Sequence, residues 1–139
     1  MLYSMEITKA FEIHASHRLN NSELSEGENK ELFGKCNNLP NHGHSFILEV
    51  TVYGNVDKRS GMVINFADLK KIVNEKIIEP LDHHFINEVE PYSRFITTCE
   101  NMLACMWQIL KSELPGLKRL KLYETSTSYG VCEGEFEKY

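Results

Sequence analysis

The amino-acid sequence predicts an α+β fold, in which two helices pack on one face of an antiparallel β-sheet. Two kinds of segment lead to this prediction: segments in which apolar and polar residues alternate, as in half-buried strands, and segments with apolar residues at helical spacing. In chain order they are strands at 3–15 and 44–53, helices at 66–79 and 98–113, and strands at 117–125 and 128–137. Strands that precede and follow a pair of helices favour an antiparallel sheet. A length of 139 residues suits one domain, residues 1–139.

The first strand is predicted from a row of apolar side chains of one parity, which only Lys9 interrupts. The row consists of Tyr3, Met5, Ile7, Phe11, Ile13 and Ala15. Because alternate side chains of a strand point to opposite faces, His17 continues this core-facing row, whereas His14 faces the other way.

A long polar segment, residues 20–35, separates this strand from the next. It has little periodicity, so we expect a loop with room for a short helical turn; a loop of this length in a compact domain is usually functional or disordered. The second strand places one row of side chains on one face: His44, Phe46, Leu48, Val50 and Val52. Gly54 and Asn55 end it, and a turn at 57–61 leads to a short extended segment at 62–64.

The two helices are expected to have defined ends. Asn65 can cap the first helix, and Pro80 is expected to stop it. The second helix begins near Thr98 and ends before Pro115. Its apolar stripe consists of Leu103, Met106, Trp107 and Leu110. Residues 126–128 then form the predicted hairpin turn between the last two strands.

Composition argues against several classes of protein. Hydrophobic residues make up 42% and charged residues 25%, as in ordinary soluble domains, and the formal net charge of −5 lacks the basic surplus of a nucleic-acid-binding protein. No apolar run is long enough to span a membrane, and the first residues show no secretory signal. The four cysteines form no CxxC pair, which indicates free thiols and a cytoplasmic protein. We therefore expect neither a nucleic-acid nor a membrane partner.

Three histidines form the strongest candidate for a metal site. His42 and His44 are two residues apart, so an extended chain directs both imidazoles to one face, and Gly43 between them allows a close approach. His17, on the predicted neighbouring strand, would supply a third nitrogen. Three imidazoles suit Zn²⁺ and leave one tetrahedral position open, as in catalytic zinc sites. The alternative is a polar loop with exposed histidines.

Cys36 shortly precedes this pair and has two alternative roles. It can complete a structural site with four ligands, or it can stay unligated as a base whose thiolate form the cation favours. Asp82 and His83 follow the first helix and could take part in proton transfer with that thiol, or simply form a solvated turn. His84 has no assigned role, and we expect it at the surface.

Two glutamates have alternative explanations as well. The spacing of Thr97 and Glu100 matches a capping box at the start of the second helix. Glu124 ends the third strand, where a buried carboxylate needs a partner. Its two oxygens could accept hydrogen bonds from the edge of an amino-pyrimidine ring; otherwise it is an exposed carboxylate at the edge of the sheet.

A series of short motifs, in order, resembles the 6-pyruvoyltetrahydropterin synthase family. The motifs are SHRL at 16–19, FGKCNN at 33–38, HGH at 42–44, GMV at 61–63, PLDH at 80–83, EN at 100–101 and YET at 123–125. Together they cover about residues 5–135. The related bacterial 6-carboxytetrahydropterin synthases share the zinc histidines but usually have a shorter first loop and a shorter spacing from cysteine to histidine. Residues 20–35 and the FGKCNN motif are more similar to the pyruvoyl enzymes.

The resemblance implies a tetrahydropterin-synthase (T-fold) subunit, which has a four-stranded antiparallel sheet with two helices on one side. In that family three subunits join their sheets into a barrel, and two trimers stack into a homohexamer, a dimer of trimers. The active sites lie between subunits. The resemblance also implies a Zn²⁺ cofactor held by His17, His42 and His44.

Further roles follow from the same resemblance. Cys36, Asp82 and His83 would carry the proton transfers. Glu124 would hold the pterin ring, and Glu100, Thr97 and Thr98 would assist it. Cys99 stands where the family commonly has serine or threonine, which affects a local contact to the pterin, and His84 replaces a residue that is often basic.

The implied activity is that of a zinc-dependent carbon–oxygen lyase of tetrahydrobiopterin biosynthesis. It would convert 7,8-dihydroneopterin triphosphate to 6-pyruvoyltetrahydropterin and eliminate triphosphate. An internal redox shift needs no nicotinamide, in agreement with the absence of a GxGxxG fingerprint. Lys35 and Arg18 are candidates for contacts to the triphosphate, or they are solvated. The alternatives are a 6-carboxytetrahydropterin synthase of the deazaguanine (queuosine) pathway, which uses the same substrate, and a non-catalytic zinc-binding module.

Overall fold

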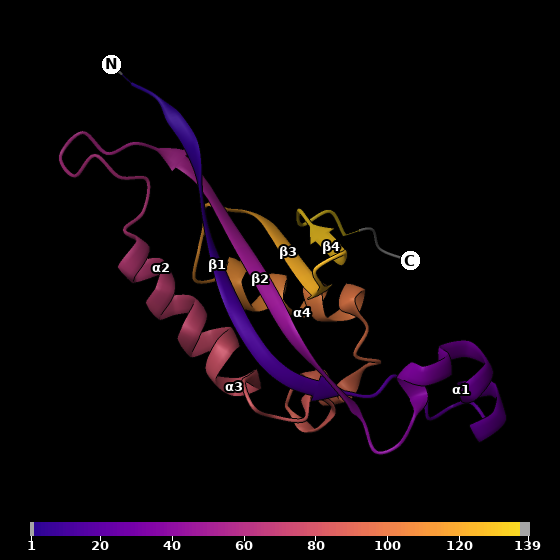
Figure 1. Cartoon of the computed structure of the whole chain (residues 1–139). Helices are drawn as coiled ribbons and strands as arrows, with labels where there is room; N and C mark the ends of the chain where they lie inside the picture. The colour runs from indigo at the N-terminus through magenta and orange to yellow at the C-terminus, as the bar shows by residue number, and fades with distance from the viewer. Residues whose placement is uncertain (1, 137–139) are drawn as a thin grey trace.

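A single four-stranded antiparallel sheet forms the centre of the computed structural model, which describes residues 2–136 (Figure 1). Its strands are β1 (Ser4–His17), β2 (His42–Asn55), β3 (Leu117–Thr125) and β4 (Ser128–Cys132). Each strand pairs with the next one along the chain, in the order β1-β2-β3-β4. The predicted α+β fold with four antiparallel strands is confirmed.

β1 and β2 form a long ribbon that is paired over its whole length, from Ser4 opposite Asn55 to His17 opposite His42. Both strands extend further than alternation predicted, β1 to residue 17 and β2 from residue 42. They extend because each strand supplies main-chain hydrogen-bond donors and acceptors to the other, even where the side chains alone do not favour a strand. As a result, His17 and His42 face each other at one end of the sheet.

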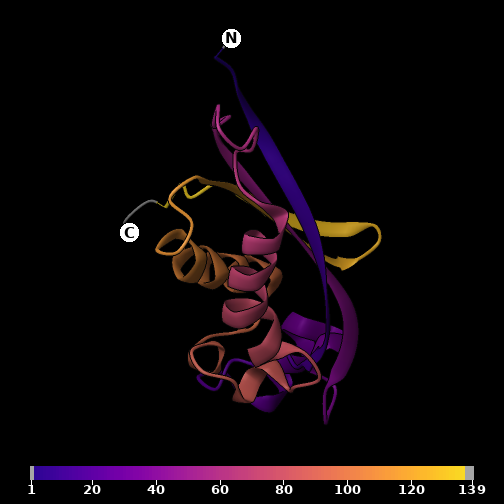
Figure 2. The same cartoon turned by 90° about the vertical axis from the view of Figure 1, so that its left-hand side faces the viewer.

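Helices cover one face of this sheet (Figure 2). The first helical stretch consists of α2 (Phe66–Val73), a π turn (Asn74–Ile78) and α3 (Glu79–Leu81), and the second is α4 (Cys99–Lys111). The core between helices and sheet includes Phe46, Leu48, Val50, Leu69, Val73, Ile77, Met102, Met106 and Leu110. Burial of this apolar surface provides the main favourable contribution to folding.

Pro80 does not stop the first helical stretch as predicted. The helix continues to Leu81, and the Asp82 amide donates a hydrogen bond to the Ile78 carbonyl at 2.7 Å. The π turn just before the proline winds more widely than an α-helix, and it relieves the clash that the proline ring would otherwise cause. The turn with Asp82 and His83 therefore leaves the helix directly after Leu81.

The polar segment at 20–35 contains more regular structure than predicted. It includes α1 (Glu26–Phe33), which begins with a capping box formed by Ser25 and Glu28, and a 3₁₀ turn (Gly34–Asn37) follows. In Figure 1 α1 lies beyond one end of the sheet, away from α2 and α4. The helix depends on its caps and on local hydrogen bonds rather than on an apolar stripe, so hydrophobic periodicity gave little sign of it.

Two further predictions need correction. Thr98, and not Thr97, is the N-cap of α4: its hydroxyl accepts a hydrogen bond from the Asn101 amide at 3.3 Å. The capping box predicted for Thr97 and Glu100 is therefore wrong, and Glu100 is exposed. β4 ends at Cys132 because its pairing with β3 ends there, whereas the prediction extended to residue 137, which lies outside the described residues.

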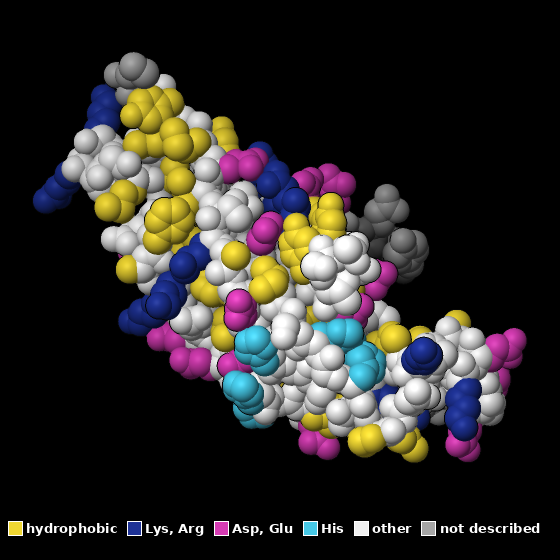
Figure 3. All heavy atoms as spheres, viewed as in Figure 1, with side chains coloured by type: hydrophobic (Ala, Val, Ile, Leu, Met, Phe, Trp, Pro, Cys, Tyr) yellow, Lys and Arg dark blue, Asp and Glu magenta, His cyan; other side chains and the backbone are white. Residues whose placement is uncertain are grey.

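The face of the sheet opposite the helices carries a network of charges. Arg119 on β3 bridges Glu6 on β1, at 3.2 Å, and Glu133 after β4, at 3.0 Å. Hydrogen bonds from Arg119 and Lys118 lower the pKa of Glu6 to about 2. Acidic and basic side chains are interspersed on the molecular face in Figure 3, and no large patch of one sign is seen there. None of the helices in the described part of the chain is both long and apolar enough to cross a membrane.

The packing of α4 can be tested with a matched pair of variants. Leu110 is completely buried, so Leu110→Ala should leave a cavity and lower the free energy of unfolding by about 2–5 kcal/mol. Gln108→Ala, on the exposed side of the same helix, should change it by less than about 0.5 kcal/mol. Urea unfolding at one fixed protein concentration measures both values. Equal losses for the two variants would contradict the packing described.

Candidate functional site

The three histidines predicted to bind a metal converge at one end of the sheet. His17 is the last residue of β1, His42 is the first residue of β2, and His44 lies two residues further on the same face. Their ring centroids are separated by 4.5 Å (His17–His42), 4.8 Å (His42–His44) and 5.2 Å (His17–His44). One nitrogen from each ring can be chosen so that all three lie within 4.8 Å of one another.

Hydrogen bonding leaves these nitrogens suited to a metal. Nδ1 of His17 lies 2.8 Å from the Thr97 carbonyl oxygen, which can only accept, so this nitrogen is the donor and Nε2 presents its lone pair to the cluster. Within the described residues, this buried Nε2 and both ring nitrogens of His42 have no hydrogen-bond partner. Buried polar atoms rarely remain unpaired in a folded protein. Three converging imidazoles with free lone pairs fit Zn²⁺, and Cys36 is not part of this group.

The electrostatics of the site favour neutral imidazoles beside a charged carboxylate. Burial is the main cause that lowers the pKa of both His42 and His44. Repulsion from His17 adds to it, and attraction to Glu124 opposes it. Glu124 Oε1 lies 3.4 Å from Nε2 of His17. A hydrogen bond from a protonated Nε2 lowers the pKa of Glu124, although burial opposes this. When Nε2 carries its lone pair instead, two acceptors face each other here, an arrangement that suits a cation.

Cys36 is held close to the end of β1 by main-chain and side-chain hydrogen bonds. It lies in the 3₁₀ turn at 34–37, where its carbonyl accepts from the Leu19 amide at 2.9 Å. The next residue, Asn37, is buried, and its Nδ2 donates to the Leu19 carbonyl at 2.8 Å. Nε of Arg18 donates to the Asn37 carbonyl at 2.8 Å. The thiol is thus tied to the segment that directly follows His17.

Asp82 and His83 lie against the edge of β1. The His14 amide donates to Oδ1 of Asp82 at 2.8 Å, the His83 amide donates to the His14 carbonyl at 2.6 Å, and Nε2 of His83 is 3.6 Å from Oδ2 of Asp82. His83 has a φ of 59°, a left-handed conformation that is uncommon for residues other than glycine and that is often found at functional sites. Its side chain is 79% exposed.

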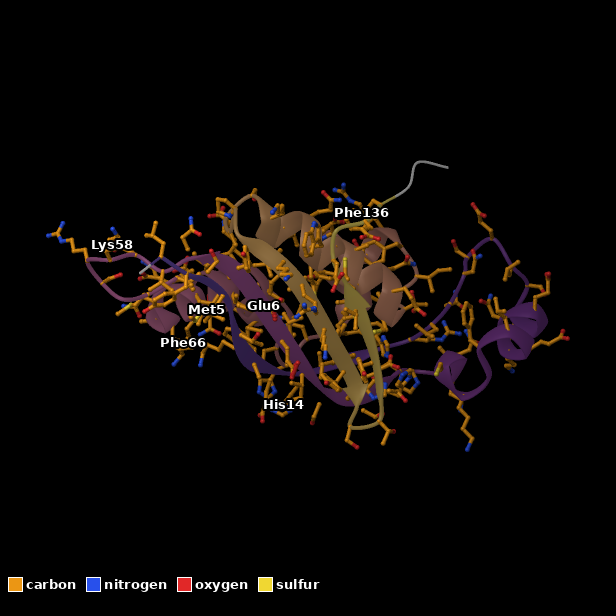
Figure 4. All side chains as sticks on the ribbon, turned by 90° about the horizontal axis from the view of Figure 1, so that it is seen from above. Met5, Glu6, His14, Lys58, Phe66 and Phe136 are labelled. Carbon is orange, nitrogen blue, oxygen red and sulfur yellow. The ribbon has the colours of Figure 1, made fainter. Side chains whose placement is uncertain are left out.

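The Asp82–His83 pair and Cys36 are hydrogen-bonded to different points along the chain of β1 and its continuation, at His14 and at Leu19. Among the described residues no hydrogen bond or ion pair joins Cys36 to Asp82 or His83. The ring of His83 lies 6.1 Å from that of His14, which points away from α4 on the uncovered side of the sheet (Figure 4). His14, His44, His83 and the exposed His84 line a common hollow. Figure 3 shows the histidines of this molecular face in two groups.

Several of the residues expected to bind the pterin surround a second hollow, of about 410 Å³, here called the Glu124 hollow. Its lining consists of Leu19, Phe33, Thr98, Cys99, Glu100, Glu124, Ser128, Tyr129 and Gly130. The structure therefore brings Glu124, Glu100 and Thr98 together. Thr97 is completely buried, and its carbonyl contacts His17 instead. Burial raises the pKa of the Cys99 thiol to about 11, so this thiol stays protonated at neutral pH.

Two asparagines that the sequence analysis did not assign also contribute to the site. The only sequence cue for Asn37 is its position directly after Cys36. Asn87 forms two hydrogen bonds with the main chain of Arg18, which is far from it in sequence, and no local sequence pattern predicts this contact. Only the folded chain shows this contact.

Comparisons with known proteins agree with these features. The family model for 6-pyruvoyl tetrahydropterin synthase matches residues 6–135. The 6-pyruvoyl tetrahydrobiopterin synthase of Homo sapiens is 42% identical over 133 residues, which cover 94% of this chain and 92% of the human protein. The 6-carboxy-5,6,7,8-tetrahydropterin synthase of Haemophilus influenzae is 33% identical over 150 residues, with 92% of this chain and 96% of that protein covered.

A solved structure extends this similarity to three dimensions. The 6-pyruvoyl tetrahydropterin synthase of Caenorhabditis elegans superposes with a TM-score of 0.86 at 34% identity and covers 97% of each chain. The Plasmodium falciparum 6-pyruvoyl tetrahydropterin synthase, at 18% identity and a TM-score of 0.66, shares the fold. The chain described here is therefore a T-fold protein and belongs to the 6-pyruvoyl tetrahydropterin synthase family.

Proposed function

We propose that this chain is a zinc-dependent 6-pyruvoyltetrahydropterin synthase. It converts 7,8-dihydroneopterin triphosphate to 6-pyruvoyltetrahydropterin and triphosphate in tetrahydrobiopterin biosynthesis. The observation that carries the proposal is the cluster of three imidazoles next to Glu124, in which His17 and His42 have buried, unpaired nitrogens. The long segment at 20–37 and the identity with the pyruvoyl enzymes favour this product over that of the carboxy enzymes.

The residues of the site have distinct proposed roles. His17, His42 and His44 hold Zn²⁺, which supplies Lewis-acid polarisation of the substrate's side-chain hydroxyl oxygens when it is bound. Cys36 takes a proton from the substrate side chain as a thiolate, and it returns the proton later in the reaction. Asp82 orients His83, which exchanges protons at the other face of the side chain.

Glu124 anchors the pterin in the Glu124 hollow. Its ionised carboxylate can accept hydrogen bonds from the amino group and the adjacent ring N–H of the substrate. Glu100 and Thr98 line the same hollow and assist, and Thr97 assists through its contact with His17. The ring gains the electron pair that the side chain loses as it becomes a diketone, so the reaction consumes no external reductant.

Because Cys36 is hydrogen-bonded to Leu19 and His83 to His14, with no bond between the two in the described part of the chain, we propose that they meet across a subunit boundary. β1 and β4 are the edge strands of the described sheet, and open edges are commonly covered by pairing with another subunit. A homohexamer, a dimer of trimers, closes these edges and completes each active site with residues from two chains. The four free cysteines suit a reducing compartment, and we place the reaction in the cytoplasm.

Product identification tests the proposed reaction directly. The purified protein, incubated with 7,8-dihydroneopterin triphosphate, should release triphosphate and form 6-pyruvoyltetrahydropterin. A chelator should abolish turnover, and added Zn²⁺ should restore it, because the imidazoles alone cannot polarise the hydroxyl oxygens. Release of acetaldehyde with a 6-carboxy product would instead identify a 6-carboxytetrahydropterin synthase.

The role of the thiol is tested by Cys36→Ala. We expect kcat to fall by about 10²-fold or more, as is typical for loss of a general base, while the zinc content stays the same because Cys36 is not a ligand. Cys132→Ala removes another partly buried thiol and should change neither quantity. Loss of zinc in Cys36→Ala would show that Cys36 is a fourth ligand, and unchanged turnover would exclude it as the base.

The histidine cluster should make stability dependent on pH. Its lowered pKa values mean that the unfolded chain, near the ordinary value of 6.5, binds protons before folded His42 and His44 do. The Tm of the zinc-free protein should therefore fall as the pH drops below about 6.5, and the lowered pKa of Glu124 acts in the same direction at lower pH. Thermal unfolding between about pH 8 and pH 5 measures this. His42→Ala should reduce the slope; a Tm that rises on acidification would contradict the prediction.

A further inference from the structure

We propose that Asn87 is a positioning residue of the metal centre and that it acts through Thr97 on His17. This inference rests on the zinc site of the proposed function, but not on the reaction. Asn87 lies in the 3₁₀ turn at 86–88, shortly after Asp82 and His83. Asn87 is far in sequence from the three histidines, so the spacing of the histidines does not point to it.

The side chain of Asn87 forms two hydrogen bonds with the main chain of Arg18, directly after His17. Its Nδ2 donates to the Arg18 carbonyl at 2.7 Å, and its Oδ1 accepts from the Arg18 amide at 3.0 Å. The two bonds resemble the pair that a neighbouring strand would provide. They continue a parallel bridge between Ser16 and Phe85 along the edge of β1. The side-chain amide thus holds the end of β1 at the point where its pairing with β2 stops.

The same Oδ1 also accepts a hydrogen bond from the Thr97 hydroxyl, at 3.3 Å. Thr97 is completely buried, and its carbonyl accepts the bond from Nδ1 of His17 at 2.8 Å. Asn87 therefore holds both partners of this contact: the strand that carries His17 and the residue whose carbonyl orients its ring. Outer contacts of this kind fix the tautomer and direction of a metal-bound imidazole.

One consequence concerns Nε2 of His17. If the Thr97 carbonyl shifts, Nδ1 loses its acceptor, and the ring can rotate or take the other tautomer, in which Nε2 carries the proton and cannot bind a metal. Loss of an outer partner typically weakens metal binding by about 10–100-fold.

Zinc affinity of the full-length protein tests the inference without reference to turnover. Competition with a chromophoric zinc chelator gives the Kd. Asn87→Ala should raise the Kd by about 10–100-fold. Asn29→Ala is the matched control, since Asn29 is a buried asparagine with several hydrogen bonds inside residues 21–29 and none to the site. Its Kd should equal that of the wild type.

A second variant separates positioning from general destabilisation. Thr97→Val removes the hydroxyl that donates to Asn87 but keeps the carbonyl that faces His17. It should raise the Kd by a smaller factor, and the double variant should bind zinc no more weakly than Asn87→Ala alone, because both changes act through one contact. Far-UV circular dichroism verifies that each variant is folded, and if Asn87→Ala is unfolded, Thr97→Val alone decides.

The outcomes are distinct from those for the reaction. A wild-type Kd in Asn87→Ala or in Thr97→Val, an equal loss in Asn29→Ala, or full additivity of Asn87→Ala and Thr97→Val would overturn the positioning role. A wild-type protein that binds no zinc would overturn it as well. If zinc binds and the variants behave as expected but no pterin product forms, the positioning role stands and the proposed reaction fails.

Discussion

The pairing register of β1 and β2 is the constraint on which the rest of this structure depends. It sets His17 directly opposite His42 and leaves His44 one step further along the same face. A shift by one residue would turn one row of imidazoles to the opposite face of the sheet and would expose the apolar row that continues it. The hydrophobic core and the histidine cluster are therefore specified together. The register that buries Phe46 and Leu48 also directs the imidazoles to the same face of the sheet. Folding of the sheet therefore also assembles the histidine cluster.

The histidine cluster lies at the end of the apolar core, and leaving its buried nitrogens unpaired there costs free energy of folding. The rings of His17 and His44 pack edge-on against Phe46, with centroids 5.6 and 5.3 Å away, so their nitrogens lie in a poorly hydrated environment. Burial keeps His42 and His44 neutral, which is the form that a metal needs. The proposed Zn²⁺ would satisfy the unpaired nitrogens and place positive charge beside Glu124, and binding it would stabilise the folded chain.

Much of the fold and part of the site could be predicted from sequence, and the physical reasons for success and failure differ by residue. Side-chain parity identified the first two strands, apolar residues around a turn identified the last two, and the parity of His17 with Phe11 and Ile13 placed it correctly on the core side. Local rules were less successful where a neighbouring turn changed the outcome, as with Pro80 after a π turn and the N-cap at Thr98 instead of Thr97. The hydrogen bonds between Asn87 and Arg18 join residues that are far apart in sequence, so no local sequence pattern could predict them.

The separation of Cys36 from His83 has a consequence for how activity depends on assembly. The Cys36 carbonyl is hydrogen-bonded to Leu19, just beyond the core-facing His17, whereas the His83 amide is hydrogen-bonded to His14 on the uncovered side. The proposed roles need these two groups on opposite faces of one substrate. If a second chain provides the missing group, each chain binds zinc and pterin with its own His17 and Glu124 but needs a neighbour for proton exchange. Metal binding is then a property of the single chain, whereas catalysis is a property of the assembled protein. The observed contacts agree with this proposal: Asn37 and Asn87 are tied by hydrogen bonds to the segment that follows His17, which includes Arg18, whereas His83 is exposed on a left-handed turn.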